Sequence, residues 1–419
     1  MNILFIADNF PPETNAAATR VFERAVHWAR WGHEVTVITA FPNFPQGKVY
    51  EGYRNDWYGE ESRDGIRVIR VKTFIAPNRG AVLRTLDFLS FMAVAVAVGF
   101  VQRRPDVVVA TSPQFFAALA GWLLSLRHWR PFVFELGDIW PASIVAVGAM
   151  RPSPALRLME KIELFLYRRA AVVAALTRAF KANLVGRGIA ADKIAVVRNG
   201  VDLSRYQPCP RDHTLAAEWG AANKFVIGYV GTHGMAHGLA NVLDAAERLR
   251  HRDDIRFLLV GDGAERAMLL DQKQRRKLDN VLMFPLQPKE AMRRIWSLCD
   301  VALVHLRNSP VFAEVIPSKI FEAMAMGLPL LAVMPAGEAA NIVTERKAGL
   351  WVPPEDPTAL AEAAEKLADD TPLRAALAAA SLAAAPFYTR RRQAEEMLQA
   401  LEIAAAGWGD RAGQEMAAP

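Results

Sequence analysis

One segment, VFAEVIPSKIFEAMAMGLP, carries side chains that suit a sugar joined to a phosphate. Its two glutamates, Glu314 and Glu322, have seven residues between them, and carboxylates accept hydrogen bonds from the hydroxyls of a sugar or a ribose. Ser318 is a typical N-cap for a helix ending near Met326, whose free amides and positive dipole end favour a diphosphate. Lys319 adds a mobile positive charge there. The spacing alone also fits a surface helix with two ordinary glutamates.

Two glycine-rich turns follow apolar strand patterns and are candidates for phosphate contact. Their residues are Gly231, Thr232 and His233 in the first turn, and Gly261, Asp262 and Gly263 in the second. Glycine lets a backbone approach a phosphate closely. The second turn resembles half of a dinucleotide-binding fingerprint, but Ala264 and Glu265 follow in place of a third glycine, which disfavours a nicotinamide oxidoreductase. Plain strand-to-helix turns are the alternative for both.

The first half of the chain offers three further candidates. In FPPETNAAATR, Asn15 is a polar cap for a predicted helix and Arg20 lies one turn inside it, so both could face a phosphate or an acceptor. In ELGDIWP, Asp138 follows a buried strand pattern and could act as a base or bind a hydroxyl. A helix or turn cap is the alternative role for Asp138.

An alternation of strand and helix patterns must position these side chains. Strands are predicted near residues 2–7, 33–39, 66–71, 107–111, 132–135, 172–176 and 194–197, and then near 225–230, 256–260, 281–284, 301–306, 329–333 and 350–352. Helices fill the gaps, among them 17–31, 154–169, 238–251, 264–276, 357–380 and 390–405, with a frayed tail from residue 407.

This order predicts an α/β protein of two doubly wound, parallel-sheet, Rossmann-like domains that face a cleft. The predicted domains are residues 1–203, rejoined by a C-terminal helix at about 388–406, and residues 204–387. Ligands of open α/β sheets bind beyond the carboxyl ends of the strands, so every loop that follows a strand is a candidate wall of the site.

Composition excludes several classes of protein. The 419 residues are 52% hydrophobic and 22% charged, which is incompatible with a disordered chain. The two cysteines, Cys209 and Cys299, and 8 histidines without an HExxH or CxxC pattern predict no metal site and a reducing compartment. The first seven residues lack the charged start of a signal peptide, so a cytoplasmic location is expected.

Positive charge and an apolar stretch coincide in the first half. Residues 1–203 hold 25 Lys and Arg against 17 Asp and Glu, whereas residues 204–419 hold 25 against 27, within a net charge of +6. The apolar run 86–101 predicts a buried helix, with a membrane-dipping helix as the alternative, because it is shorter than the roughly 20 residues of a span. Together with the amphipathic stretch 151–169, it predicts peripheral attachment to an anionic membrane surface. Nucleic acid is disfavoured because no binding motif is recognised.

Six motifs, in order along the chain, carry a resemblance to a known family. They are FPP near residue 11, ELGDIWP, IAVVRNGVD, YVGTHG, LVGDG and EVIPSKIFEAMAMGLP. Together they resemble the retaining glycosyltransferases of family 4, which have the GT-B fold, and most closely the bacterial L-fucosamine-type transferases of O-antigen and capsule synthesis. The resemblance implies transfer of an N-acetylated amino sugar, with retention and without a metal or other cofactor, from a UDP-sugar to a lipid-linked or lipopolysaccharide acceptor. It also implies an acceptor-binding first domain and a donor-binding second domain.

The same resemblance assigns roles to single residues. Glu314 matches the glutamate that contacts the donor sugar, and Glu322 matches the one that holds the ribose. Gly231 and Thr232 match the phosphate-side turn, and Asn199 matches the Asn-Gly turn before the hinge. No protein nucleophile is implied, because the departing phosphate oxygen can take the proton of an acceptor that attacks from the same face.

The chain also departs from the family pattern. Asn15-Ala16 stands where many relatives have a double glycine, and THGMAHGL has no basic side chain other than histidine where many carry Arg and Lys. The family's usual histidine is not evident near Asp138. Lys319, with Arg20 from the first domain, is the candidate for the missing charge. A UDP-sugar 2-epimerase of the same twin fold and a non-catalytic nucleotide-sugar-binding assembly subunit stay open as alternatives.

Overall fold

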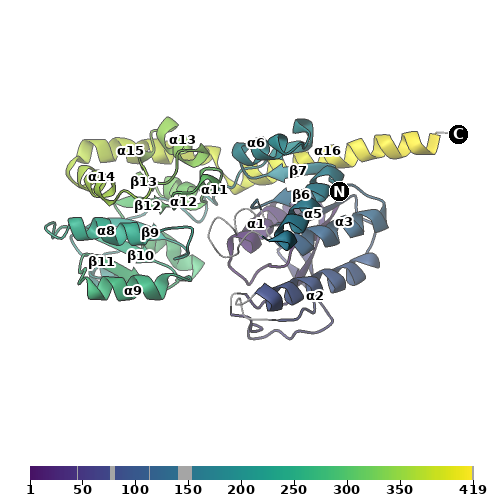
Figure 1. Ribbon diagram of the computed structural model, residues 1–419, viewed down its shortest axis with the longest axis horizontal. Helices are drawn as coiled ribbons and strands as arrows, with labels where there is room; N and C mark the ends of the chain where they lie inside the picture. The colour runs from purple at the N-terminus through teal and green to yellow at the C-terminus, as the bar shows by residue number, and fades with distance from the viewer. Residues whose placement is uncertain (45, 76–80, 113, 140–152, 418–419) are drawn as a thin grey trace. The chain divides into compact units, whose positions relative to one another are not determined.

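The chain folds into two compact units, each an α/β layer structure (Figure 1). The computed structural model describes residues 1–44, 46–75, 81–112, 114–139 and 153–417. Unit 1 comprises Met1–Arg198 and Arg390–Pro419, and unit 2 comprises Asn199–Thr389. The sequence predicts the same division with its boundaries near residues 203 and 388, a few residues from where the units separate.

Unit 1 is built on an eight-stranded sheet with the order β3-β4-β2-β1-β5-β6-β7-β8. The strands are β1 (Asn2–Ile6), β2 (Glu34–Ala40), β3 (Tyr58–Arg63), β4 (Ile66–Val71), β5 (Val107–Thr111), β6 (Phe132–Leu136), β7 (Val172–Ala175) and β8 (Ile194–Val196). All neighbours pair in parallel except β3 and β4. The sequence analysis missed β3 because this edge strand, YGEESR, has no fully buried residue and therefore no apolar pattern.

Helices cover this sheet and close its core. They are α1 (Ala16–Arg30), α2 (Ala81–Phe100), α3 (Phe115–His128), α5 (Pro154–Arg169), α6 (Arg178–Gly186), the 3₁₀ turn Ala191–Lys193 and α16 (Arg390–Ala417). The C-terminal helix α16 packs beside α1, and Trp28 Nε1 of α1 donates to the Ala394 carbonyl at 2.9 Å. The predicted frayed tail is wrong, because α16 continues past Gly407 to Ala417, although each glycine within it costs a helix about 1 kcal/mol.

The apolar helix α2 is not the buried helix that the sequence predicts. Its buried residues, Phe91, Ala95 and Gly99, recur every fourth position and face α3, where the Gly99 carbonyl lies 2.9 Å from His128 Nε2. The 18-residue window Leu83–Phe100 has a mean hydropathy of 1.7, and only 17% of it is buried. By length and composition this helix could cross a membrane, so the expectation that the run is too short for a span is also wrong.

Unit 2 is built on a six-stranded parallel sheet with the order β11-β10-β9-β12-β13-β14. The strands are β9 (Phe225–Val230), β10 (Ile255–Val260), β11 (Val281–Phe284), β12 (Val301–His305), β13 (Leu330–Val333) and β14 (Gly349–Val352). This is the Rossmann order, in which the connections reverse direction between the first and fourth strands, here β9 and β12. The second doubly wound domain predicted from the sequence is therefore confirmed, with the reversal point fixed.

The helices of unit 2 follow its strands in alternation. They are α7 (His213–Glu218), α8 (Ala240–Arg248), α9 (Arg266–Arg275), the 3₁₀ turn Lys289–Ala291, α10 (Met292–Trp296), α11 (Pro310–Ala313), α12 (Lys319–Ala325), α13 (Glu338–Glu345), α14 (Pro357–Asp369), α15 (Thr371–Ala384) and the 3₁₀ turn Ala385–Phe387. The single helix predicted over 357–380 is wrong. Two helices meet at Asp370, whose carboxylate accepts from the Leu373 N–H at 2.8 Å, because Pro372 fits the first turn of a new helix better than the middle of an old one.

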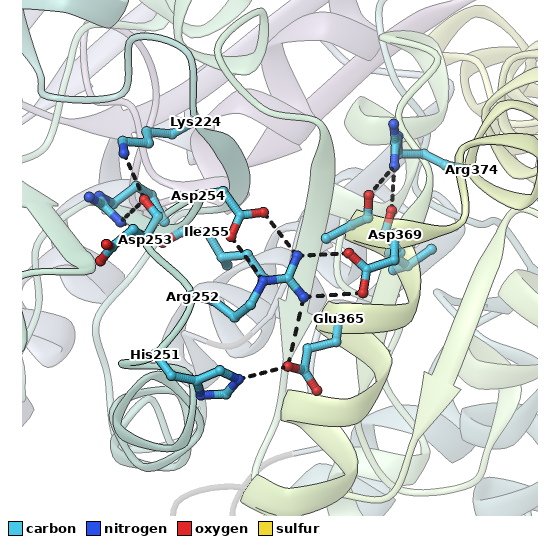
Figure 2. A network of polar contacts seen from close by, with 12 residues as sticks. Lys224, His251, Arg252, Asp253, Asp254, Ile255, Glu365, Asp369 and Arg374 are labelled. Atoms are coloured by element: carbon cyan, nitrogen blue, oxygen red, sulfur yellow. Dashed lines mark hydrogen bonds and ion pairs between the residues drawn. The ribbon is translucent and has the colours of Figure 1, made fainter.

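A network of charged side chains joins the amino ends of β9 and β10 to α14 (Figure 2). Arg252 lies at its centre, 2.9 Å from Asp254 and 2.7 Å from Asp369. Glu365 pairs with His251 at 3.3 Å and with Arg252 at 3.8 Å. Arg252, Asp254, Glu365 and Asp369 each have a partner of opposite charge, so the centre of the network links elements of the fold.

Candidate active site

The predicted donor residues of unit 2 gather at the carboxyl edge of its sheet. The turns holding Gly231 and Gly261 follow β9 and β10, and Lys319 lies on the connection that follows β12. Strands β9 and β12 are neighbours and mark the point where the chain reverses its direction of winding. Ligands of doubly wound sheets bind in the crevice that this reversal opens, so this edge is the candidate active site.

The two glycine turns are packed backbone against backbone. The Gly231 N–H donates to the Val260 carbonyl at 2.9 Å, and the His233 N–H donates to the Asp262 carbonyl at 2.9 Å. A Cβ on Gly261 would stand 1.8 Å from the Gly231 carbonyl oxygen. Gly261 also has a φ of +154°, which L side chains rarely adopt. The contact between the turns therefore requires glycine at this position, whether or not a phosphate binds there.

The absence of a side chain at Gly231 leaves room for another side chain, whereas at Gly261 it leaves room for backbone. A Cβ on Gly231 would stand 2.8 Å from Lys319 Nζ, so this glycine lets the ammonium group approach the turn. The turn itself is held by the Tyr229 hydroxyl, which donates to the Thr232 carbonyl at 2.7 Å. Asp262 is exposed, and its carboxylate accepts from the Gly263 N–H at 2.8 Å. The predicted turn residues are thus brought together, with one side of the turn lined by Lys319.

The Lys319 amine is buried and is not the mobile charge that the sequence predicts. Its side chain is 9% exposed, and its Nζ lies 3.7 Å from the centroid of the Tyr229 ring. Among the residues that the structure describes, none makes a hydrogen bond to this Nζ. Burial lowers the pKa of Lys319 to about 7, and the carboxylate of Glu322 acts in the opposite direction.

Ser318 does not cap the helix as the sequence predicts. It precedes α12 with helical backbone angles and makes no side-chain capping bond. The helix is only seven residues long, from Lys319 to Ala325. The positive end of this short helix is therefore a weaker anion site than the sequence suggests, and the ammonium of Lys319 is the stronger local charge.

Three histidines lie near Lys319, two from the turn after β9 and one from the last position of β12. His233 is fully buried, and neither ring nitrogen has a hydrogen-bond partner within the described part of the chain. Burial, with Arg266 and Lys319 nearby, lowers its pKa to about 4. Burial likewise lowers the pKa of His237 to about 3 and that of His305 to about 4. All three rings are therefore neutral at pH 7.

The His305 ring is fixed by two contacts that the sequence analysis did not foresee. Its Nδ1 lies 2.6 Å from the His237 carbonyl, and its Nε2 lies 2.9 Å from the Asn241 side-chain amide. A neutral ring that donates from Nδ1 and accepts at Nε2 satisfies both contacts. The available sequence signal was a histidine at the last position of a buried strand, where a side chain can reach the carboxyl edge of the sheet.

The two glutamates lie on the connection between β12 and β13. Glu314 caps the short helix α11, and Glu322 lies in the first turn of α12, one turn from Lys319. Both are half-buried. A Cβ on Gly337 would stand 2.2 Å from the carbonyl oxygen of Ala313, so the loop after β13 presses against the backbone next to Glu314 and fixes it. The proposed contacts of these glutamates with the sugar and the ribose stay predictions.

The predicted acceptor-side residues belong to unit 1 and lie at the carboxyl edge of its own sheet. Asn15 caps α1, accepting from the Ala18 N–H at 2.9 Å. The Arg20 guanidinium is buried and pairs with Glu135 at 2.8 Å, so this charge already has a partner within unit 1. Asp138 is half-buried and directly follows Gly137, whose N–H donates to the Ser112 hydroxyl at 2.8 Å.

Glu135 is held ionised by two arginines, although burial opposes the charge. Arg24 and Arg20 lie 2.8 Å from its two carboxylate oxygens and lower its pKa to about 2. The motif residues Trp140 and Pro141 lie outside the described residues. Within the described ranges, no group of three or more His, Cys, Asp or Glu side chains could hold a metal ion. Metal independence of the reaction stays a prediction.

Comparison with known proteins yields the same two-part division. Residues 15–200 match the Glycosyl transferase 4-like domain, and residues 214–382 match Glycosyl transferases group 1. The chain is 28% identical over 340 residues to the putative colanic acid biosynthesis glycosyl transferase WcaI of Escherichia coli K12, covering 78% of this chain and 82% of that one. It is 26% identical to the GDP-mannose-dependent alpha-mannosyltransferase of Mycobacterium tuberculosis over 84% of each chain.

The fold is shared with solved structures at low sequence identity. Anabaena Alr3699/HepE in complex with UDP and glucose has a TM-score of 0.73 and 22% identity, covering 96% of this chain and 99% of that chain. WaaG, a glycosyltransferase involved in lipopolysaccharide biosynthesis, has a TM-score of 0.69 and 16% identity, with the same coverage.

Together the two family matches leave only short ends and a linker uncovered, and they meet close to the boundary between the two units. The protein is a glycosyltransferase, and its two doubly wound domains are those of the GT-B fold. Within that class it belongs to family 4.

Proposed function

We propose that the protein is a retaining glycosyltransferase that moves an N-acetylated amino sugar from a UDP-sugar to a lipid-linked or lipopolysaccharide acceptor in bacterial surface polysaccharide synthesis. The observation that carries the donor assignment is the buried Lys319 ammonium, without a hydrogen-bond partner among the described residues, beside the Gly231 turn at the strand reversal. A diphosphate is the chemical group that this position lacks. The names of WcaI and HepE, colanic acid biosynthesis and a UDP complex, support the proposal.

The reaction requires the protein to position a positive charge and groups that accept hydrogen bonds from hydroxyls. As the bond between the sugar and the nucleotide diphosphate breaks, negative charge grows on the leaving phosphate oxygen. Lys319 stabilises that charge, and removal of one such donor typically costs about 3–4 kcal/mol of transition-state stabilisation. An acceptor hydroxyl attacks from the face that the diphosphate leaves, its oxygen forms the new glycosidic bond, and its proton passes to the departing phosphate oxygen.

Four other residues complete the proposed roles. Glu314 binds hydroxyls of the donor sugar, and Glu322 holds the ribose. Asp138 and Asn15 serve the acceptor side. A ribose contact is the same in the ground state and the transition state, so Glu322→Gln should raise KM, whereas Glu314→Gln should lower kcat.

Nucleotide binding is the direct test of the donor. Thermal unfolding is measured with UDP, GDP and UDP-N-acetylglucosamine in separate wells, with and without EDTA. Ligand at a hundred times its Kd should add about 2.7 kcal/mol of stability. Stabilisation by UDP and its sugar, unaffected by EDTA, is expected. Because one relative is GDP-mannose-dependent, stabilisation by GDP alone would replace the UDP assignment, and no shift with either nucleotide would overturn the donor site.

Product analysis separates transfer from the two alternatives. A transferase releases UDP in step with acceptor glycosylation, and NMR of the product gives the anomeric configuration that retention requires. A UDP-sugar 2-epimerase would change the sugar nucleotide without any acceptor. A non-catalytic assembly subunit would bind the donor and leave it intact.

The acceptor proposal gives the exposed face of α2 a role at the membrane. Four of its large apolar side chains are exposed: Leu83, Leu86, Leu89 and Phe100. Arg84 and Arg127 lie over neighbouring aromatic rings of the same surface, at 5.4 and 4.2 Å from the ring centroids. Apolar side chains bordered by arginine favour the interface of an anionic bilayer. We propose peripheral attachment of unit 1 to the cytoplasmic leaflet through this face, because the opposite face of α2 packs on α3.

Liposome flotation tests this attachment. Binding to vesicles containing phosphatidylglycerol should weaken with salt and should be lost in the double variant Leu86→Glu/Leu89→Glu. Leu382→Glu, an exposed leucine of unit 2, is the matched control and should bind normally. Resistance to a carbonate wash would replace peripheral attachment by a true span, and absence of binding would favour a soluble acceptor.

A further inference from the structure

We propose that the donor diphosphate binds together with a proton, which Lys319 takes up at Nζ, so that donor affinity falls as the pH rises above neutrality. The inference rests on the proposed function, since it concerns the regulation of the same donor site. It follows from how Lys319 is surrounded before any donor arrives.

The surroundings of Lys319 provide little stabilisation for an ammonium group. Its Nζ is buried against the Tyr229 ring and the Gly231 backbone, with no hydrogen-bond partner among the described residues. An ammonium that leaves water without such partners is strongly disfavoured. The cation–π contact with Tyr229 offsets only part of that cost.

The charged and titratable groups that face Lys319 do not neutralise it. Strand β9 contributes the Tyr229 phenol, whose pKa burial raises well above 10, so it carries no charge at neutral pH. The turn after β9 contributes His233 and His237, and β12 contributes His305, all neutral at pH 7 because burial lowers their pKa values to between about 3 and about 4. The acidic group acting on Lys319 is Glu322 of α12, which raises its pKa less than burial lowers it.

A bound diphosphate reverses this balance. It brings negative charge and acceptor oxygens to the Gly231 turn, so the charged form of Lys319 gains the partners that it lacks in the free protein. In the free protein the pKa of Lys319 is lowered to about 7. Binding raises it, and a proton from the buffer therefore joins Nζ whenever the pH lies between the free and the bound pKa. Below the free pKa the group is already charged, and binding takes up no proton there.

The test is calorimetric titration of the full chain with UDP in two buffers of different ionisation enthalpy. The measurements run from about pH 7 to about pH 8.5, where the terminal phosphate of UDP, with a pKa of about 6, stays ionised. Wild-type protein should take up close to one proton per UDP at about pH 8.5 and about half a proton at about pH 7. Over the same range the logarithm of the affinity should fall with a slope approaching one per pH unit.

Two variants identify the titrating group. Lys319→Arg keeps a charge that does not titrate, so UDP binding should lose its proton uptake and its pH slope. His233→Gln removes the neighbouring ring that could otherwise take the proton, and its uptake should equal that of wild type. Should either variant fail to fold, the other and the wild-type slope still decide the question.

The outcomes separate this inference from the proposed function. UDP binding with no proton uptake in wild type overturns proton coupling and leaves the donor site intact. Uptake that persists in Lys319→Arg and disappears in His233→Gln moves the proton to the histidine and overturns the role of Lys319. Absence of UDP and GDP binding at every pH, including about pH 6 where Lys319 is already charged, overturns the proposed function itself.

Discussion

Two polar regions of unit 2 contrast at opposite edges of the same sheet. At the amino ends of β9 and β10, Arg252 is held by Asp254 and Asp369, all three reached by solvent (Figure 2). At the carboxyl ends, Lys319 and His233 are buried, and their nitrogens have no hydrogen-bond partners among the described residues. A charge pair within reach of water adds little to stability, whereas a buried polar atom without a partner lowers it.

The contrast supports the proposal that the carboxyl edge of the sheet binds the donor. A buried ammonium without hydrogen-bond partners destabilises a fold, unless a ligand supplies those partners. The Arg252 network is complete without a ligand, so its loss should change folding alone. The Lys319 amine has no hydrogen-bond partner among the described residues. Replacing Lys319 should therefore lower activity and leave the free energy of unfolding unchanged or higher. The predictions below test this opposition, beginning with the largest expected effect.

Lys319→Met should separate activity from stability. Turnover should fall by about 10²- to 10³-fold, because a donor to the leaving group is lost. The free energy of unfolding should stay the same or rise, because an apolar side chain of similar length replaces an unpaired buried amine. Transfer assays and urea unfolding on the same preparations measure both. Lys224→Met, whose ammonium donates to the Asp253 carbonyl in the Arg252 network, is the control and should leave turnover unchanged. Equal, small changes in both measurements would show that Lys319 is an ordinary structural lysine.

Gly261→Ala should lower the free energy of unfolding. The new Cβ would overlap the Gly231 carbonyl, and overpacking of this kind typically costs about 1–3 kcal/mol. Urea unfolding followed by tryptophan fluorescence measures the loss. The matched control is Gly186→Ala at the end of α6, where nothing lies within 4 Å of the new Cβ, and this variant should be as stable as wild type. A stable Gly261→Ala protein with weakened UDP binding would mean that the glycine serves the phosphate and not the packing of the turns.

Most of the fold could be predicted from the sequence, because buried parallel strands appear as unbroken apolar runs. VVVAT of β5 is entirely buried, and IRFLLV of β10 nearly so. The failures have physical causes. Strand β3 buries nothing and gives no signal, and α2 is apolar although it is mostly exposed. An apolar pattern indicates that a surface avoids water without indicating whether protein or lipid covers it.

The sequence indicates which residues gather at the carboxyl edge of the sheet, but it does not indicate their electrostatics. Glycines and a lysine after strands indicate an anion site, and the structure brings Gly231 and Lys319 together. The sequence could not reveal that Lys319 is buried over Tyr229, because that contact joins residues ninety positions apart. Nor could it reveal that Arg20 pairs with Glu135, which gives this guanidinium a partner inside unit 1.

Acid should destabilise the site edge before it affects the Arg252 network. His233, His237 and His305 have pKa values lowered to about 4, 3 and 4, below the ordinary value of 6.5. Between about pH 6.5 and about pH 4, the unfolded chain binds protons that the folded chain does not, so stability falls as the pH falls. Each histidine contributes a slope of up to about 1.4 kcal/mol per pH unit. Urea unfolding at several pH values measures it, and a flat profile would show that the rings are already charged or solvated.

Removal of the Arg252 network should have the smallest effect. Asp369→Asn should cost less than about 1 kcal/mol, because the Asp369 side chain is 63% exposed and Arg252 keeps Asp254 as a partner. Turnover and UDP affinity should not change. Arg252 lowers the pKa of Asp254 to about 2, so the remaining pair should persist until the pH falls below about 4 and be lost toward pH 2. Urea unfolding at low and high salt gives a further check, since screening should shrink the difference between variant and wild type. A loss that is large and independent of salt would mean that the network acts as buried structure, and the contrast between the two edges of the sheet would then no longer distinguish a ligand site from a structural one.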